Sequence, residues 1–169
     1  MTQITSAPDA DASDAQGPTI GRGRPALRYS FSIRAEVDPH LPIVQRDAET
    51  LEFIPITGGP VRGELSGEIV SGGGDWCLAR ADSAYNLEAR YGIRTDGGAY
   101  VDVVNLGVLR HLPGESGGPE EMGYFLTTPT FRTTAPDLQW LTRSVFVGQA
   151  RAEGTATTID IYEVLAVPC

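Results

Sequence analysis

The stretch from residue 54 to residue 76, IPITGGPVRGELSGEIVSGGGDW, constrains the fold more than any other part of the chain. Glycines at positions 58–59 and 72–74 supply the positive φ that tight reversals need, so they predict two turns. Between the turns, residues alternate with a period of two, as in a strand with one buried face. One face carries Val61, Gly63, Leu65, Gly67 and Ile69, and the other Arg62, Glu64, Ser66 and Glu68. The interior glycines predict a sharp bend in this strand, as at the corner of a small barrel.

The same alternation recurs along most of the remaining chain. Further strands are expected at residues 27–37, 49–56, 76–81, 84–95, 99–105, 124–132, 144–151 and 157–167. Residues 136–142 predict one helical turn, and residues 111–122 a long rim loop. Many short strands without alternating helices predict an all-β fold, a single small antiparallel β-barrel of about eight or nine strands, calycin-like in form. Such a barrel is filled by side chains or holds one small ligand.

The chain length of 169 residues suits one domain. Residues 1–25 are rich in Ala, Asp, Ser, Gly and Pro and show almost no apolar periodicity, so burial would not offset the entropy of ordering them. We expect a disordered leader at residues 1–25 and a barrel domain at residues 26–169. The alternative is a leader that folds over a barrel mouth as a lid.

The charge balance excludes several classes of partner. The chain has 13 basic and 22 acidic residues, a formal net charge of -9, which repels phosphate backbones and anionic membranes. We therefore expect no nucleic-acid partner and no membrane partner. Neither an export signal nor a run of eighteen apolar residues is found, which predicts a cytoplasmic location. All basic residues are arginine, a bias typical of a high-GC bacterial source.

Motifs for cofactors and metals are absent from the sequence. No phosphate-cradling loop, dinucleotide turn or H-E-x-x-H occurs, so we expect no cofactor and no metal site. His40 and His111 fall in separate predicted loops, which disfavours a Ser-His-Asp hydrolase. Cys77 and Cys169 lack metal-ligand spacing and are interpreted as free thiols.

Four blocks of sequence, taken in order, resemble the DUF3237 (UPF0311) family. They are ITGG followed by GGDW within residues 56–76, YGIRTDGG at 91–98, YFLTTPTF at 124–131 and WLTRSVFVG at 140–148. The resemblance covers roughly residues 28–165, and the ordered set is specific. It implies a small antiparallel β-barrel far more firmly than a reaction, so function has to be argued from the residues of a site.

The family blocks contain aromatic, arginine and carboxylate residues at predicted strand ends. The resemblance suggests Asp75, Asp96 and Tyr124 as candidate catalytic residues, and as candidate substrate-binding residues Trp76, Tyr91, Arg94, Trp140 and Arg143. If all eight met at one barrel mouth, aromatic walls would hold a mostly apolar ligand. An arginine would fix an enolate, phenolate or carboxylate, and a desolvated aspartate would move a proton.

Each of these residues also has a structural interpretation. Asp75 and Asp96 adjoin predicted glycine turns, where carboxylates commonly accept backbone N–H bonds. The two tryptophans are also explained as core or wall residues, and the two arginines as partners of acidic neighbours.

The leading hypothesis from sequence is a cofactor-independent enzyme of small-molecule metabolism, secondary metabolism included. It would be an isomerase, cyclase or lyase acting on a polyketide-like or aromatic substrate inside the barrel. The alternative is a non-catalytic, lipocalin-like small-molecule binding protein, which would return its ligand unchanged. A structural or interaction protein is the third hypothesis, and a solidly filled barrel would distinguish it. A homodimer is compatible with the sequence.

Overall fold

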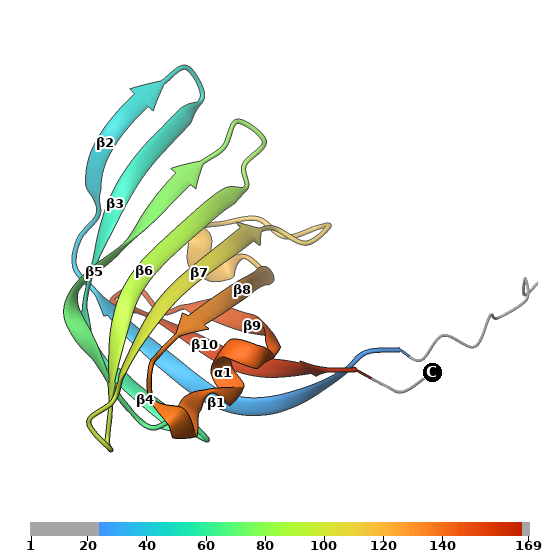
Figure 1. The fold of residues 1–169 in the computed structure, drawn as a ribbon. Coiled ribbons are helices and arrows are strands. Elements are labelled where there is room, and N and C mark those ends of the chain that lie inside the picture. Colours follow the sequence, from blue (N-terminus) through green and yellow to red (C-terminus); the bar gives the residue numbers. More distant parts are fainter. Residues whose placement is uncertain (1–23, 167–169) are drawn as a thin grey trace, which may run out of the picture.

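The computed structural model describes residues 24–166, in which ten strands form one antiparallel sheet (Figure 1). The strands are β1 (Ala26–Val37), β2 (Leu41–Arg46), β3 (Glu49–Gly58), β4 (Pro60–Gly63), β5 (Gly67–Ala79), β6 (Tyr85–Thr95), β7 (Tyr100–Arg110), β8 (Tyr124–Arg132), β9 (Val145–Ala152) and β10 (Ala156–Leu165). Pairing of β1 with β10 joins the two sides of the sheet into a barrel, from which only β2 stands apart, paired to β3. The predicted all-β antiparallel barrel is confirmed.

The strand β2 is the element that the sequence pattern missed. Prolines at positions 39 and 42 predicted a break without a strand, because proline cannot donate to a ladder. In the structure Pro42 lies within β2, opposite Glu52 of β3. β2 pairs only with β3, so it is an edge strand, where a missing N–H on the free side leaves no ladder bond unmade. This strand accounts for the count of ten instead of eight or nine.

The first half of the central stretch folds differently from the prediction. The expected single strand is broken, because β4 ends at Gly63, residues 64–66 turn, and β5 begins at Gly67. Gly63 has φ of 135°, and a Cβ there would lie 2.6 Å from the carbonyl oxygen of Ser30. Only glycine fits both this backbone conformation and this close approach. The predicted burial nevertheless holds, since Val61 before the turn, Leu65 within it and Ile69 after it are all buried.

The second predicted turn, at residues 71–74, is also wrong. These residues lie inside β5, and the ladder from β5 to β6 shifts register between Val70 and Gly74. Gly72 has φ of 108°, as in a bulge, where an extra residue bends a strand without reversing it. β5 therefore curves and pairs with β4 along its first part and with β3 along its second part.

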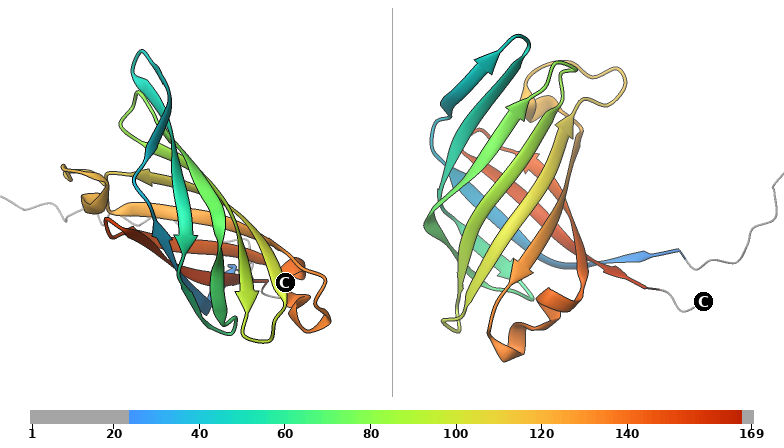
Figure 2. Two further views of the ribbon diagram at one scale, coloured as in Figure 1. Left: turned by 90° about the vertical axis from the view of Figure 1, so that its left-hand side faces the viewer. Right: turned by 45° about the horizontal axis from the view of Figure 1, so that its top comes forward.

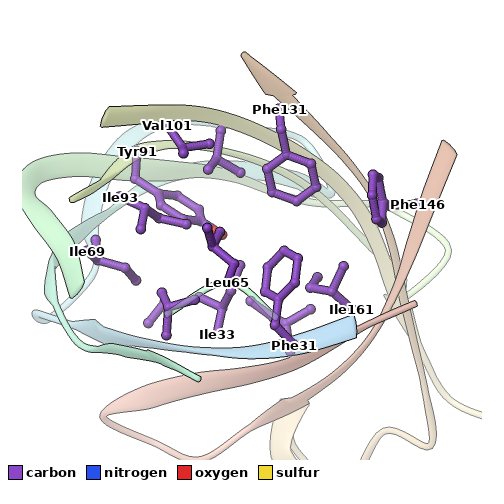
Figure 3. Packing of buried hydrophobic residues seen from close by; sticks show 14 of the residues in the cluster. Phe31, Ile33, Leu65, Ile69, Tyr91, Ile93, Val101, Phe131, Phe146 and Ile161 are labelled. Carbon is purple, nitrogen blue, oxygen red and sulfur yellow. The ribbon is translucent and has the colours of Figure 1, made fainter. Parts of the chain in front are cut away.

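One end of the barrel, which we call the packed end, is filled with large apolar side chains. It carries the β4–β5 and β6–β7 turns, and beside them the connection from β8 to β9 forms two short helical segments, η2 (Pro136–Leu138) and α1 (Trp140–Arg143) (Figure 1). Figure 3 shows the side chains of Phe31, Phe131 and Phe146 meeting inside the ring of strands. The ring of Phe31 lies 5.7 Å from that of Phe131, which lies 5.3 Å from that of Phe146. The predicted helical turn at residues 136–142 is thus confirmed, and it belongs to the packed end.

The opposite end, which we call the cavity end, is bordered by hairpins and one long loop. Its rim includes the β2–β3 hairpin, the β5–β6 and β9–β10 turns, and the loop at residues 111–123, which contains the short helix η1 (Pro119–Glu121). The right-hand view of Figure 2 shows the β2–β3 hairpin and this loop at the same end of the molecule. The long irregular segment that the sequence predicted therefore is a rim loop.

The described residues leave out both chain ends. Residues 1–23 of the predicted leader and the terminal Cys169 lie outside them, so those two predictions stay as they were. Within the described part of the chain, no helix has the length and apolar character to span a membrane.

Candidate functional site

The barrel interior is hollow toward the cavity end. A cavity of about 320 Å³ lies there, and most of its wall is apolar, with Ile54, Ile56, Leu109, Phe125 and Ile159 among its lining residues. The space exists because small residues occupy inner positions of the strands: Ala35 on β1, Ala89 on β6 and Gly107 on β7. Ligand-binding pockets in proteins have volumes from about 300 Å³ upward, so this cavity suits one compact ligand.

Asp75 brings a carboxyl group into this apolar cavity. It lies on the inner face of β5, opposite Ala89 of β6, and its Oδ1 accepts a hydrogen bond of 2.9 Å from the backbone N–H of Glu88. Burial raises the pKa of Asp75 from its ordinary 3.8 to about 6, because desolvation disfavours the charged form. The bond from Glu88 and the charge of His40 oppose this shift. The group can therefore hold or release a proton near neutral pH.

Three further polar side chains in the cavity wall lack a hydrogen-bond partner among the described residues. They are the hydroxyl of Tyr91 on β6, Oδ1 of Asn105 on β7 and the hydroxyl of Thr127 on β8. Each residue is at most 6% exposed. Burial, and then the nearby charge of Asp75, raise the pKa of Tyr91, so its hydroxyl keeps its proton. Buried polar atoms in proteins are almost always bonded, which makes a cluster of three unbonded ones unusual.

The mouth of the cavity carries a second group of ionisable side chains. His40, in the segment before β2, bonds through Nδ1 to Oε2 of Glu52 on β3 at 3.0 Å, and both line the cavity. Cys77 lies on β5 opposite Glu52, and burial raises its pKa to about 12, so it is a neutral thiol. The described residues contain no group of three or more His, Cys, Asp or Glu side chains arranged to hold a metal ion.

Two of the predicted site residues lie on the outside of the barrel. Trp76 directly follows Asp75 in a strand, so the two side chains point to opposite faces. The indole is 41% exposed and packs against Phe53, with ring centroids 5.0 Å apart. Tyr124 is half-buried, and the guanidinium of Arg110 lies over its ring at 4.0 Å. Trp76 and Tyr124 both border a more open, mostly apolar groove on the outer surface rather than the cavity.

The remaining four predicted residues lie at the packed end. Asp96 is exposed in the β6–β7 turn, and Arg94 beside it donates to the carbonyl oxygen of Gly98 at 3.3 Å. Trp140 of α1 packs edge-on against Phe31 at 6.3 Å, as a core residue, and Arg143 at the end of α1 is exposed. The cavity opens at the other end, so none of these four side chains lines it.

Of the eight predicted residues, only Asp75 and Tyr91 line the cavity. The expectation that all eight meet at one mouth is not met, because alternation turned Trp76 outward and the antiparallel path carried Arg94, Asp96, Trp140 and Arg143 to the far end. The sequence prediction missed His40, Glu52, Asn105 and Thr127. A usable signal existed for two of them: Asn105 and Thr127 are polar residues at positions where the period-two pattern of β7 and β8 requires apolar ones.

Comparison with known proteins agrees with this architecture. The family model described as "Protein of unknown function (DUF3237)" matches residues 25–164. A UPF0311 protein of Rhodopseudomonas palustris is 36% identical over 147 residues, which cover 82% of this chain and 95% of the relative.

Two solved structures have a similar fold. A β-barrel-like protein from Acinetobacter baumannii has a TM-score of 0.78 at 26% identity, covering 87% of this chain and all of that one. A protein from Penicillium herquei called an enzyme has a TM-score of 0.68 at 21% identity, covering 88% of this chain and 99% of that one.

Proposed function

The chain belongs to the DUF3237 family, and from that premise we propose that it is a cofactor-independent enzyme that moves a proton on a small ligand held in the cavity. The observation that carries the proposal is the Asp75 carboxyl group, which lies in an apolar cavity with its pKa raised to about 6. A general base works best when its pKa lies near the working pH, because it is then both ionised and basic enough. The enzyme from Penicillium herquei, with the same fold, is consistent with catalysis by such a barrel.

The chemistry follows from what the cavity contains. Ionised Asp75 takes a proton from an O–H, or from a C–H next to a carbonyl, and the electron pair stays on the substrate as a phenolate or enolate. Protonated Asp75 then returns the proton at another atom, so atoms and electrons balance without a co-reactant. Depending on whether the anion shifts a double bond, attacks within the molecule or expels a group, the reaction is an isomerisation, a cyclisation or an elimination. Polyketide-like and aromatic compounds have such acidic protons.

The sequence predicted that an arginine would stabilise an anionic ligand group, but in the cavity neutral hydroxyl groups are placed to do this. None of the described residues that line the cavity is an arginine. The hydroxyl groups of Tyr91 and Thr127 are donors in the same wall, and a desolvated donor stabilises developing negative charge on oxygen.

A non-catalytic carrier of the lipocalin type is the second candidate function. It is favoured by the bond from the Glu88 N–H to Asp75, which gives this carboxyl group a structural partner as well. A carrier uses the same cavity but leaves the ligand unchanged.

Hydrogen–deuterium exchange distinguishes the two functions without knowledge of the true substrate. The protein is incubated in D2O with a panel of phenols and enolisable ketones, and mass spectrometry follows deuterium uptake at carbon above the buffer rate. An enzyme accelerates uptake for at least one compound, and Asp75→Asn abolishes the acceleration. Asp96→Asn, which changes the exposed carboxyl group at the packed end, is the matched control and keeps it.

The outcome that contradicts catalysis is that every compound of the panel that binds in the cavity exchanges at the buffer rate. The cytoplasmic location and the homodimer stay predictions from the sequence, to be tested by cell fractionation and light scattering.

A further inference from the structure

We infer that Tyr91, Asn105 and Thr127 form a recognition subsite for an uncharged ligand that carries a hydroxyl group on an apolar, ring-sized body. This inference names the ligand class of the proposed function and rests on the part of it that places the ligand in the cavity. It holds for an enzyme and for a carrier alike.

The three residues are neighbours across adjacent strands. Tyr91 pairs with Val103, and Thr127 pairs with Gly107, so Asn105 lies diagonally next to both of them on β7. Diagonal neighbours on one face of a sheet are about 7–8 Å apart, within reach of one ligand group between them. Figure 3 shows the ring of Tyr91 extending from β6 into the barrel interior. The three residues therefore occupy neighbouring positions in one part of the cavity wall.

Small residues leave the space in front of this part of the wall. Thr127 is flanked by Gly107 on β7 and by Gly148 on β9. A Cβ on Gly148 would lie 2.3 Å from the Thr127 hydroxyl oxygen. Ala89 lies between Asp75 and Asn105 in the same row of the sheet. Across two strand spacings Asp75 and Asn105 are about 10 Å apart, so a ring can reach both.

The protein itself does not complete the hydrogen bonds of the subsite. A buried polar atom without a protein partner costs free energy in the folded state unless another molecule in the cavity bonds to it. Phenylalanine at 91 and valine at 127 fit the same space without this penalty. A ligand that completes the hydrogen bonds of Tyr91, Asn105 and Thr127 explains why these positions hold polar residues and not apolar ones.

The chemistry of the subsite selects the ligand class. Oδ1 of Asn105 needs a donor, whereas the two hydroxyl groups can donate or accept. One ligand hydroxyl satisfies both requirements, because it donates through its hydrogen and accepts through its oxygen. A carboxylate donates nothing, and it would be desolvated near Asp75 and Glu52 without any arginine among the described lining residues. The apolar remainder of the wall takes the body of the ligand.

The affinities of three simple probes, phenol, toluene and benzoate at pH 7.5, test the ligand class of the subsite. Titrations followed by protein NMR give the affinities. Phenol is expected to bind about tenfold more tightly than toluene, since each net hydrogen bond contributes a factor of about two to ten. Benzoate is expected to bind more weakly than either.

The variants Thr127→Val and Tyr91→Phe carry the decisive pair of measurements. Each is expected to weaken phenol binding about three- to tenfold while leaving toluene binding unchanged. Each is also expected to raise the melting temperature of the ligand-free protein by about 2–4 °C, because an unbonded polar atom is removed. A purely structural role predicts the opposite change in melting temperature. Thr128→Val and Tyr100→Phe, at exposed positions, are the matched controls and change neither quantity.

Two results overturn the subsite: unchanged phenol affinity in both variants, or benzoate binding as tightly as phenol. Failure of the proposed catalytic function looks different. If phenol binding depends on Thr127 and Tyr91 but deuterium exchange never exceeds the buffer rate, the subsite stands and the protein is a carrier.

Discussion

The two ends of the barrel are built from the same strands but differ in what faces inward. At the packed end the inner positions of β1, β8 and β9 hold Phe31, Phe131 and Phe146. Further along the same strands, toward the cavity end, they hold Ala35, Thr127 and Gly148. The exchange of large apolar residues for small or polar ones along each strand leaves a solid core at one end and a cavity at the other.

Because of this difference, the packed end mainly stabilises the fold, whereas the cavity end holds the candidate binding groups. The packed end buries aromatic rings edge to edge and is closed by Trp140 of α1, and such packing contributes most of the favourable free energy of folding. The cavity end keeps a buried carboxyl group and polar atoms that have no protein partner, and burial of such groups opposes folding. A barrel closed firmly at one end tolerates these groups at the other.

The largest expected effect comes from opening the packed end. Phe31→Ala removes a fully buried ring and should lower the free energy of unfolding by about 3–5 kcal/mol. Phe125→Ala, at the wall of the cavity, should lower the free energy of unfolding by about 1–2 kcal/mol less than Phe31→Ala, because fewer atoms surround the lost ring. Urea unfolding measures both values, and equal losses would contradict the difference in packing.

The second effect concerns charge at the cavity end. The pKa of Asp75 is about 6 in the folded protein and near 3.8 when unfolded, so the folded state binds the proton more tightly. Its contribution to stability is complete below about pH 4 and is lost as the pH rises through about 6. Asp75→Asn should therefore raise the free energy of unfolding at pH 8 by about 2–3 kcal/mol relative to wild type, since two pKa units correspond to that energy.

The measurement for Asp75→Asn is urea unfolding at several pH values. The wild-type protein should lose stability between pH 4 and 6 more steeply than the variant. A variant that is instead less stable at pH 8 would show that the carboxylate acts mainly as an acceptor for the backbone.

A third test compares glycines at the two ends. A Cβ on Gly67, near the packed end, would lie 2.2 Å from the carbonyl oxygen of Arg94, so Gly67→Ala forces the backbone apart. A Cβ on Gly107, at the cavity, would lie 3.1 Å from Cγ2 of Thr127 and 3.5 Å from the next nearest atoms, so a shift of a few tenths of an ångström accommodates it. Gly67→Ala should lower stability by about 2–3 kcal/mol and Gly107→Ala by less than about 1 kcal/mol. Thermal unfolding measures both, and a reversed order would contradict the assignment of the free space.

The smallest expected effect is that of Arg143→Ala, which tests whether the ligand binds at the packed end. Arg143 is exposed at the end of α1, and the described residues offer it no ion pair. Arg143→Ala should change stability by less than about 0.5 kcal/mol and leave phenol binding unaltered. If phenol binding is lost, the ligand site lies at the packed end and the cavity has another role.

Sequence reasoning predicted the elements of this protein well where the local pattern was sufficient. The alternation of apolar and polar residues predicts β1, β8 and β9 within a residue or two of their observed bounds, because a strand with one buried face has an apolar residue at every second position. It failed where a glycine has more than one possible use. The glycines at 72–74 serve as a bulge rather than a turn, and Gly63 opens the reversal that the pattern did not contain.

The sequence by itself determined an antiparallel β-barrel, its buried faces and the presence of aspartate and tyrosine among the family blocks. Only the tertiary structure decided which of those residues share a cavity. The physical reason is that period-two alternation assigns a side chain to a face of its own strand, whereas its neighbours depend on strand order and register. Register puts Asp75, Ala89 and Asn105 in one row and Arg94 at the other end of the barrel, where the connection from β8 to β9 also holds Trp140.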